Sequence, residues 1–310
     1  MGPIVSFNQS RGRKAEAMLV LVTLIWGGTF ATTKSLTHTI DPASLLALRF
    51  GIASLAFFLF FFKKLSTSLH GKVWLHGMIL GMFLYGGYIL QTIGLQSTSS
   101  SRSGFITVLY VALTPLLQMI LTRKLPRRRI RLGLGMVLLG LWGLTAPGES
   151  ISGMIEPWRT GGFGIGDLLT LGGACSFAIY IILLDRFGSY DVIPLTGVQI
   201  ATMFTLALVQ VFFSGHPTLP TGIAQWGDML YLSILSGVLG TYWQTRYQRY
   251  TTPTRAAAIY TLEAVFAALV GGVFLGEWLG LIGVIGGALI VAGLLIVEWP
   301  SGEIAIADEI

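Results

Sequence analysis

The polar groups of this chain that could do chemistry lie inside long apolar stretches. Glu263 is the eighth residue of the stretch 256–276, which places it roughly 10 Å along a helix that rises 1.5 Å per residue. A carboxylate at such a depth in a bilayer is costly, so it is expected to face a cavity or a partner. It can contact an amine or carry a proton. It can equally serve as a neutral acid that hydrogen-bonds a neighbouring helix, and the sequence leaves both interpretations open.

A second set of polar residues occurs twice. The stretches 87–109 and 240–262 align without a gap, and the identical residues lie 153 positions apart. Such a match, at about half the chain length, indicates two copies of one unit. The identical pairs are Gly87/Gly240, Gln91/Gln244, Thr92/Thr245, Thr98/Thr251, Arg102/Arg255, Ile106/Ile259 and Leu109/Leu262.

Gln91 and Gln244 are the polar pair of this repeat. They are candidates for hydrogen-bonding a substrate or for closing two gates, and the alternative is that they join neighbouring helices. Aromatic residues in apolar helices pack or anchor at the interface more often than they line a path. The aromatic candidates for the same path are Tyr88, Tyr110, Tyr260 and Trp26.

Four cations are candidates for gating or ion pairing. Arg102 and Arg255 begin their stretches at opposite ends and can pair with an acidic group when a gate is closed. The alternative is that each extends its charge to the membrane interface. Lys34 and Arg49 flank one turn, and Asp41 between them is expected to form a structural ion pair with either.

The composition requires a membrane. Hydrophobic residues make up 53% of the chain and charged residues only 11%, whereas soluble domains carry about 25% charged residues. About 20 apolar residues cross a bilayer as a helix, and period-two alternation typical of strands is missing. We therefore predict an all-α integral membrane protein with ten transmembrane helices at 17–36, 42–62, 73–96, 103–122, 132–146, 165–184, 192–213, 229–245, 256–276 and 278–297.

The charge distribution predicts the orientation. With ten spans, sixteen lysines and arginines fall on the side of the N-terminus, and only Arg102 and Arg159 fall opposite. Positive residues collect in the cytoplasm, so both termini are expected there. Two copies of five spans have opposite topologies because five is odd. The prediction is two inverted five-helix repeats, which is typical of secondary transporters with a central site between the halves.

Other classes find little support in the residues. The net charge of +6 is spread between apolar stretches and is not gathered on a nucleic-acid-binding face. The single cysteine, Cys175, excludes a disulfide framework. The four histidines are dispersed, and neither a zinc motif nor a phosphate-binding loop occurs. We therefore predict no enzyme, no catalytic residue, no metal and no cofactor.

Several motifs resemble one known family, the EamA-type transporters of the drug/metabolite transporter superfamily. They include the stretch 85–96, the stretch 260–269 around Glu263, and Leu275-Gly-Glu277. The resemblance implies ten-helix carriers of the bacterial inner membrane, many of them exporters of amino acids or other metabolites. In one departure, Ala264 stands where many members have proline after the glutamate, which bears on the flexibility of the ninth helix.

The prediction is thus a secondary transporter. It moves a small metabolite, such as an amino acid or a similar amphipathic compound, by alternating access, with or without protons, as a monomer or a homodimer. The alternatives are a membrane-embedded enzyme acting on a lipid-linked substrate, and a channel or scaffold. The expected division is an N-terminal cytoplasmic tail at 1–16, a first repeat at 17–146, an external loop at 147–162, a second repeat at 163–298 and a cytoplasmic tail at 299–310.

Overall fold

The fold is known from a computed structural model, which describes residues 9–68, 71–98, 100–123, 128–144, 164–214, 217–275 and 281–298. These residues are almost entirely helical, and no strand occurs among them, which confirms the predicted all-α fold. The predicted inter-repeat loop and the predicted tail at 299–310 lie outside the described residues. The helices are α1 (Gln9–Gly27), α2 (Thr29–Leu36), α3 (Pro42–Ser68), α4 (Val73–Leu95), α5 (Ser100–Val108), α6 (Tyr110–Thr122), α7 (Arg128–Leu144), α9 (Ile165–Arg186), α10 (Val192–Ser214), α11 (Ile223–Leu230), η1 (Tyr231–Gly240), α12 (Thr241–Tyr247), η2 (Gln248–Tyr250), α13 (Pro253–Tyr260), α14 (Leu262–Leu275) and α15 (Leu281–Glu298).

These helices join into the ten predicted spans. Length and composition alone qualify five segments to cross a membrane: Gly12–Leu36, Pro42–Leu65, Val73–Leu95, Ile165–Arg186 and Val192–Ser214. The other spans are shorter or interrupted. They are α5 with α6, α7, α11 with η1 and α12, α13 with α14, and α15.

Three spans are broken where the sequence predicts continuous helices. The breaks fall at Gly28 between α1 and α2, at Leu109 between α5 and α6, and at Thr261 between α13 and α14. At two of them the chain tightens to i→i+3 hydrogen bonds, from Leu109 N to Ile106 O (3.2 Å) and from Thr261 N to Ala258 O (3.2 Å). In lipid the carbonyls freed at a break need other partners. The Thr261 hydroxyl donates to Ala258 O at 2.6 Å, so a threonine side chain stabilises this break.

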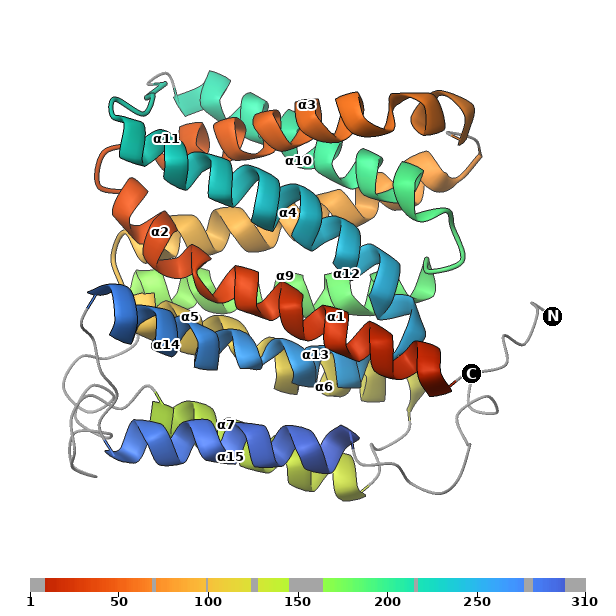
Figure 1. The fold of residues 1–310 in the computed structure, drawn as a ribbon, viewed down its shortest axis with the longest axis vertical. Coiled ribbons are helices and arrows are strands. Elements are labelled where there is room, and N and C mark those ends of the chain that lie inside the picture. Colours follow the sequence, from red (N-terminus) through yellow and green to blue (C-terminus); the bar gives the residue numbers. More distant parts are fainter. Residues whose placement is uncertain are drawn as a thin grey trace.

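Equivalent helices of the two repeats pack against each other. The fifth and tenth spans, α7 and α15, lie side by side along one edge of the bundle in Figure 1. The second and seventh spans, α3 and α10, pack together along the opposite edge. This pairing is what a pseudo-two-fold axis between inverted repeats requires.

Close helix contacts rely on glycine. A Cβ built on Gly94 of α4 would lie 2.7 Å from the carbonyl oxygen of Gly166 in α9, and a Cβ on Gly166 would lie 2.7 Å from that of Gly94. Between α7 and α15, a Cβ on Gly140 would lie 2.5 Å from Gly286 O. Lipid gives helices no hydrophobic drive to associate, so small residues that let backbones approach are what hold such contacts.

Candidate functional site

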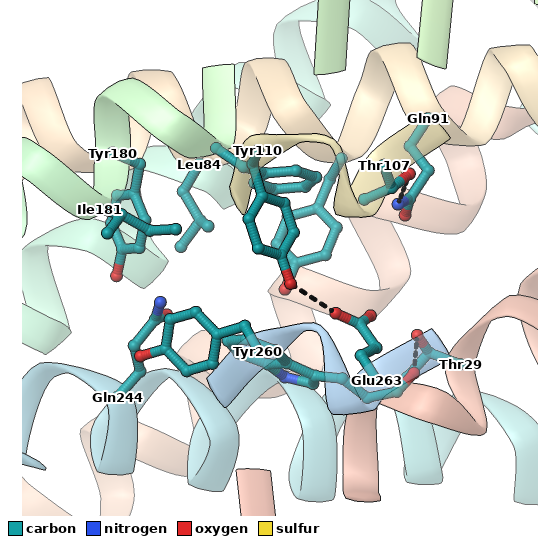
Figure 2. Close-up of a pocket in the computed structure, with 13 residues that line it drawn as sticks. Thr29, Leu84, Gln91, Thr107, Tyr110, Tyr180, Ile181, Gln244, Tyr260 and Glu263 are labelled. Atoms are coloured by element: carbon teal, nitrogen blue, oxygen red, sulfur yellow. Dashed lines mark hydrogen bonds between the residues drawn. The ribbon is translucent and has the colours of Figure 1, made fainter. Parts of the chain in front are cut away.

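A pocket opens at the helix breaks, between the two repeats (Figure 2). Its walls come from α1, α2, α4, α5 and α6 of the first repeat and from α9, α12, α13 and α14 of the second. All seven residues that we predicted for a substrate path line it, although their role in transport stays a prediction. The lining residues are Trp26, Thr29, Leu84, Tyr88, Gln91, Thr107, Tyr110, Phe177, Tyr180, Ile181, Gln244, Tyr260 and Glu263.

The pocket lies on the pseudo-two-fold axis. Tyr110 and Glu263 are 153 residues apart, which is the offset of the repeat, and the Tyr110 hydroxyl donates to Glu263 Oε2 at 3.4 Å. Two equivalent residues can touch only near the axis that relates them. Gln91 and Gln244 share the same offset and both line the pocket.

The first and sixth spans show the same repeat relation in their pattern of buried residues. In α1 and α2 the buried residues 15, 19, 22, 23, 27, 29, 30 and 33 recur in α9 at positions 151 higher. In this register Trp26 corresponds to Phe177 and Thr29 to Tyr180, and all four residues line the pocket. The two repeats therefore contribute equivalent positions but different side chains to one site.

Glu263 is the carboxylate of this pocket. Its exposed fraction is 7%, and no Lys, Arg or His stands among the lining residues. The break at Thr261 places it in the first turn of α14. The positive end of a helix dipole favours a negative charge there, so the interruption of the ninth span creates a place for the carboxylate. Many family members carry a proline after this glutamate, but this chain has Ala264. The helix breaks here without that proline, and Ala264 N donates to Thr261 O at 3.1 Å beside the break.

Aromatic rings surround this carboxylate. The Trp26 and Tyr260 ring centroids lie 5.6 Å apart, those of Tyr110 and Tyr260 6.5 Å, and those of Tyr88 and Phe177 5.4 Å. Figure 2 shows the Tyr110 hydroxyl and the Glu263 carboxylate pointing toward one another, with Gln244 farther off beside Tyr260. The arrangement offers apolar faces with one carboxyl group.

A buried chain of amides closes one end of the pocket. Gln248 Nε2 donates to Ile181 O at 2.7 Å, and Gln248 Oε1 accepts from the Tyr260 hydroxyl at 3.0 Å and from Gln244 Nε2 at 3.4 Å. Gln248 is fully buried. At the other end, Gln91 Nε2 donates to Thr107 Oγ1 at 3.0 Å.

Arg49 lies fully within the protein, behind Tyr88. Its guanidinium carbon stands 4.5 Å from the Tyr88 ring centroid, and its Nη2 donates to Ser236 Oγ at 2.8 Å. Within the described residues, no carboxylate comes within 4.0 Å of it. The expected ion pair with Asp41 is wrong, because the Asp41 carboxylate accepts from Ser44 N at 3.1 Å and so caps the start of α3.

Ser236→Ala is expected to destabilise the protein by about 1–3 kcal/mol, because it leaves a buried guanidinium without its acceptor. The measurement is the apparent melting temperature in one detergent. Ser233→Ala is the matched control: Ser233 lies one turn earlier, and its hydroxyl donates only to Met229 O of its own segment at 2.7 Å. Equal losses in the two variants would contradict a specific role for the Arg49 contact.

Comparison with known proteins gives the family. The EamA-like transporter family matches residues 13–146 and 164–299, one match for each repeat. The chain belongs to the EamA-like transporter family. Two uncharacterized transporters of Archaeoglobus fulgidus are similar: one is 30% identical over 92% of this chain and 85% of its own length, and the other is 27% identical over 91% and 96%. A crystal structure of a protein at 22% identity shares the fold, with a TM-score of 0.72 over 92% of this chain and 97% of that one.

These comparisons confirm the resemblance to the drug/metabolite transporter superfamily and the two-repeat architecture of a multi-pass membrane protein. The names of the family and of the relatives are those of transporters, not of enzymes.

Two gating candidates of this EamA-family chain, Lys34 and Arg255, are not among the lining residues. Lys34 Nζ donates to Leu95 O, the last residue of α4, and to Thr98 O at 3.0 Å. Arg255 Nη1 lies 3.8 Å from Glu16 Oε1, which joins α13 of one repeat to α1 of the other. The side chain of Arg102 lies outside the described side chains.

Sequence reasoning missed part of the pocket. Phe177 and Tyr180 were not predicted, although the 151-residue register between the first and sixth spans would have placed them opposite Trp26 and Thr29. Gln248 was missed because a glutamine near a predicted span end is usually solvated, and only the structure shows its burial.

Proposed function

We propose that this chain is a secondary transporter that moves a small amphipathic metabolite across the bacterial inner membrane by alternating access. The observation that carries the proposal is the pocket on the pseudo-two-fold axis, where Tyr110 of one repeat meets Glu263 of the other. A site shared equally by inverted halves can be exposed to either face by rocking one half against the other.

Polar contacts between the repeats supply a closure at each face. Toward the face that holds the N-terminus, Glu16 of α1 meets Arg255 of α13. Toward the opposite face, the Thr98 hydroxyl donates to Asp167 Oδ1 at 2.8 Å, joining the α4–α5 turn to α9. A hydrogen bond and a partly exposed ion pair of this kind are each worth about 1 kcal/mol. The excess of Lys and Arg supports cytoplasmic termini, and the family resemblance supports export.

The first test measures counterflow. Liposomes that contain the purified protein are loaded with unlabelled metabolite, and uptake of the same labelled compound is followed with and without a pH gradient. Transient accumulation of at least one compound is expected, because a carrier couples the movement of the two pools. Flux that grows linearly with concentration and shows no counterflow would indicate a channel instead.

The second test measures alternating access directly. The single native cysteine makes a Cys175→Ser background simple. In it, Gln91→Cys and Gln244→Cys report on the pocket from its two ends with an impermeant thiol reagent. Substrate is expected to change the two labelling rates in opposite directions, by about twofold or more if it shifts the balance of states by a few tenths of a kcal/mol. Parallel changes would contradict the mechanism.

A further inference from the structure

The hydrogen-bond polarity of the pocket points to the chemical class of its ligand. A hydroxyl carries one proton, and four lining hydroxyls already donate theirs to the protein. Thr29 donates to Trp26 O at 2.7 Å, Tyr110 to Glu263 at 3.4 Å, Tyr180 to Gln199 Oε1 at 2.9 Å and Tyr260 to Gln248 Oε1 at 3.0 Å. These groups can therefore offer a ligand only their lone pairs.

Gln248 fixes the direction of the next amide. Its Nε2 meets the carbonyl of Ile181, which can only accept, so its Oε1 is turned toward Gln244 and Tyr260. Gln244 must then present its Nε2 to Gln248. Its Oε1 is left buried, and among the described residues it has no hydrogen-bond partner. A buried unpaired acceptor costs about 1–3 kcal/mol, which a donor on a ligand would remove.

The anionic acceptor is Glu263, whose Oε2 receives only the long bond from Tyr110. The rings of Trp26, Tyr88 and Tyr260 stand around the same space, and aromatic faces attract a desolvated cation. Among the described lining residues, the buried Trp26 indole N–H has no partner, and the Tyr88 hydroxyl is a second donor. Both are neutral, so they can meet a hydroxyl or an ether but do not balance a carboxylate.

Arg49 is the cation to consider as a partner for a ligand carboxylate. Its guanidinium lies against the Tyr88 ring and bonds Ser236, and it is not among the lining residues. This charge is already engaged by the Tyr88 ring and by Ser236. A ligand with both an ammonium and a carboxylate therefore fits the charges of this pocket poorly.

We propose that the substrate is an organic cation: an ammonium group on an apolar body, without a carboxylate. In this site Glu263 and Gln244 Oε1 accept from the ammonium, and Gln248 is a positioning residue that holds Gln244 in the accepting orientation. The inference rests on the proposed function, since it takes the pocket as the substrate site, and it narrows the amphipathic metabolite to one class.

The experiment compares compounds that share one apolar body. Calorimetric titration of the purified full-length protein is carried out with 2-phenylethylamine, with L-phenylalanine, which adds a carboxylate to the same skeleton, and with 3-phenylpropionate, which has only the carboxylate. Benzylamine and n-hexylamine test other body sizes. At least one amine is expected to bind. 2-Phenylethylamine is expected to bind about tenfold or more tightly than phenylalanine, because burying the phenylalanine carboxylate without a countercharge weakens its binding.

Phenylalanine binding as tightly as the amine would overturn the proposal, and so would the absence of binding by all three amines. Loss of phenylalanine binding in Arg49→Gln would then assign the carboxylate to Arg49. Liposome flux separates this inference from the proposed function. Amines that bind but are never carried contradict transport and leave the ligand class standing. Phenylalanine that is carried while amines neither bind nor move contradicts the ligand class and leaves transport standing.

The role of Gln248 is tested by selectivity. Gln248→Met frees the Gln244 amide to turn its N–H groups into the pocket. The ratio of 2-phenylethylamine to phenylalanine affinity is expected to fall by about threefold or more, which a general loss of stability would not produce. Gln118→Met is the control, since Gln118 accepts from Thr254 at 2.6 Å and does not line the pocket. An unchanged ratio in Gln248→Met would overturn the positioning role.

Discussion

Glu263→Gln is expected to reduce substrate affinity and counterflow by about 10- to 100-fold while the protein remains folded. Hydrogen bonds to a charged group contribute about 1.5–3 kcal/mol, and each 1.4 kcal/mol is a factor of ten in affinity. Glutamine keeps the size of the side chain and an acceptor for the Tyr110 hydroxyl, so the bond across the pseudo-two-fold axis is retained. The measurement is the initial counterflow rate at several substrate concentrations.

The control for this variant is Asp228→Asn, which neutralises a carboxylate of α11 that does not line the pocket. Its counterflow is expected to match that of the unchanged protein. The same liposomes test proton coupling: if the carboxylate carries a proton, flux driven by a pH gradient disappears in Glu263→Gln. A variant that transports normally with an unchanged response to pH would show that Glu263 is a structural hydrogen-bonding residue.

Gly94→Leu is expected to give the largest loss of stability. The Cβ of any side chain at this position would meet Gly166 O at 2.7 Å and Thr170 Oγ1 at 2.6 Å in α9. Backbone cannot yield as a flexible side chain can, so α4 and α9 must move apart. Overpacking typically costs about 1–3 kcal/mol and occasionally more. The apparent melting temperature and the yield of monodisperse protein in one detergent report the effect.

Gly135→Leu is the matched control, because a Cβ built on Gly135 of α7 meets nothing within 4 Å. The substitution is the same and the host is again an apolar helix, so its melting temperature is expected to stay close to that of the unchanged protein. A comparable loss in both variants would mean that glycine at 94 matters for chain flexibility and not for the approach of the two helices.

The amino-acid sequence by itself determined the class of the protein and much of the architecture. Too few charges for a soluble surface, apolar stretches of membrane-spanning length and the 153-residue repeat are properties of the chain that no packing can alter. Glu263, Gln91 and Gln244 were found for the same reason. A polar group deep in an apolar helix must have a partner or a cavity, whatever its neighbours are.

Only the tertiary structure decided which groups meet. Asp41 looked like the partner of Lys34 or Arg49, yet it caps α3, because the backbone N–H of Ser44 lies at short range. Neither proline nor glycine stands at the helix breaks at Leu109 and Thr261, so the helix propensity of the local sequence does not predict them. They bring Tyr110 of one repeat to Glu263 of the other. Such contacts depend on the rotation and depth of each helix against its neighbours, which packing between the repeats sets and sequence spacing along one helix does not contain.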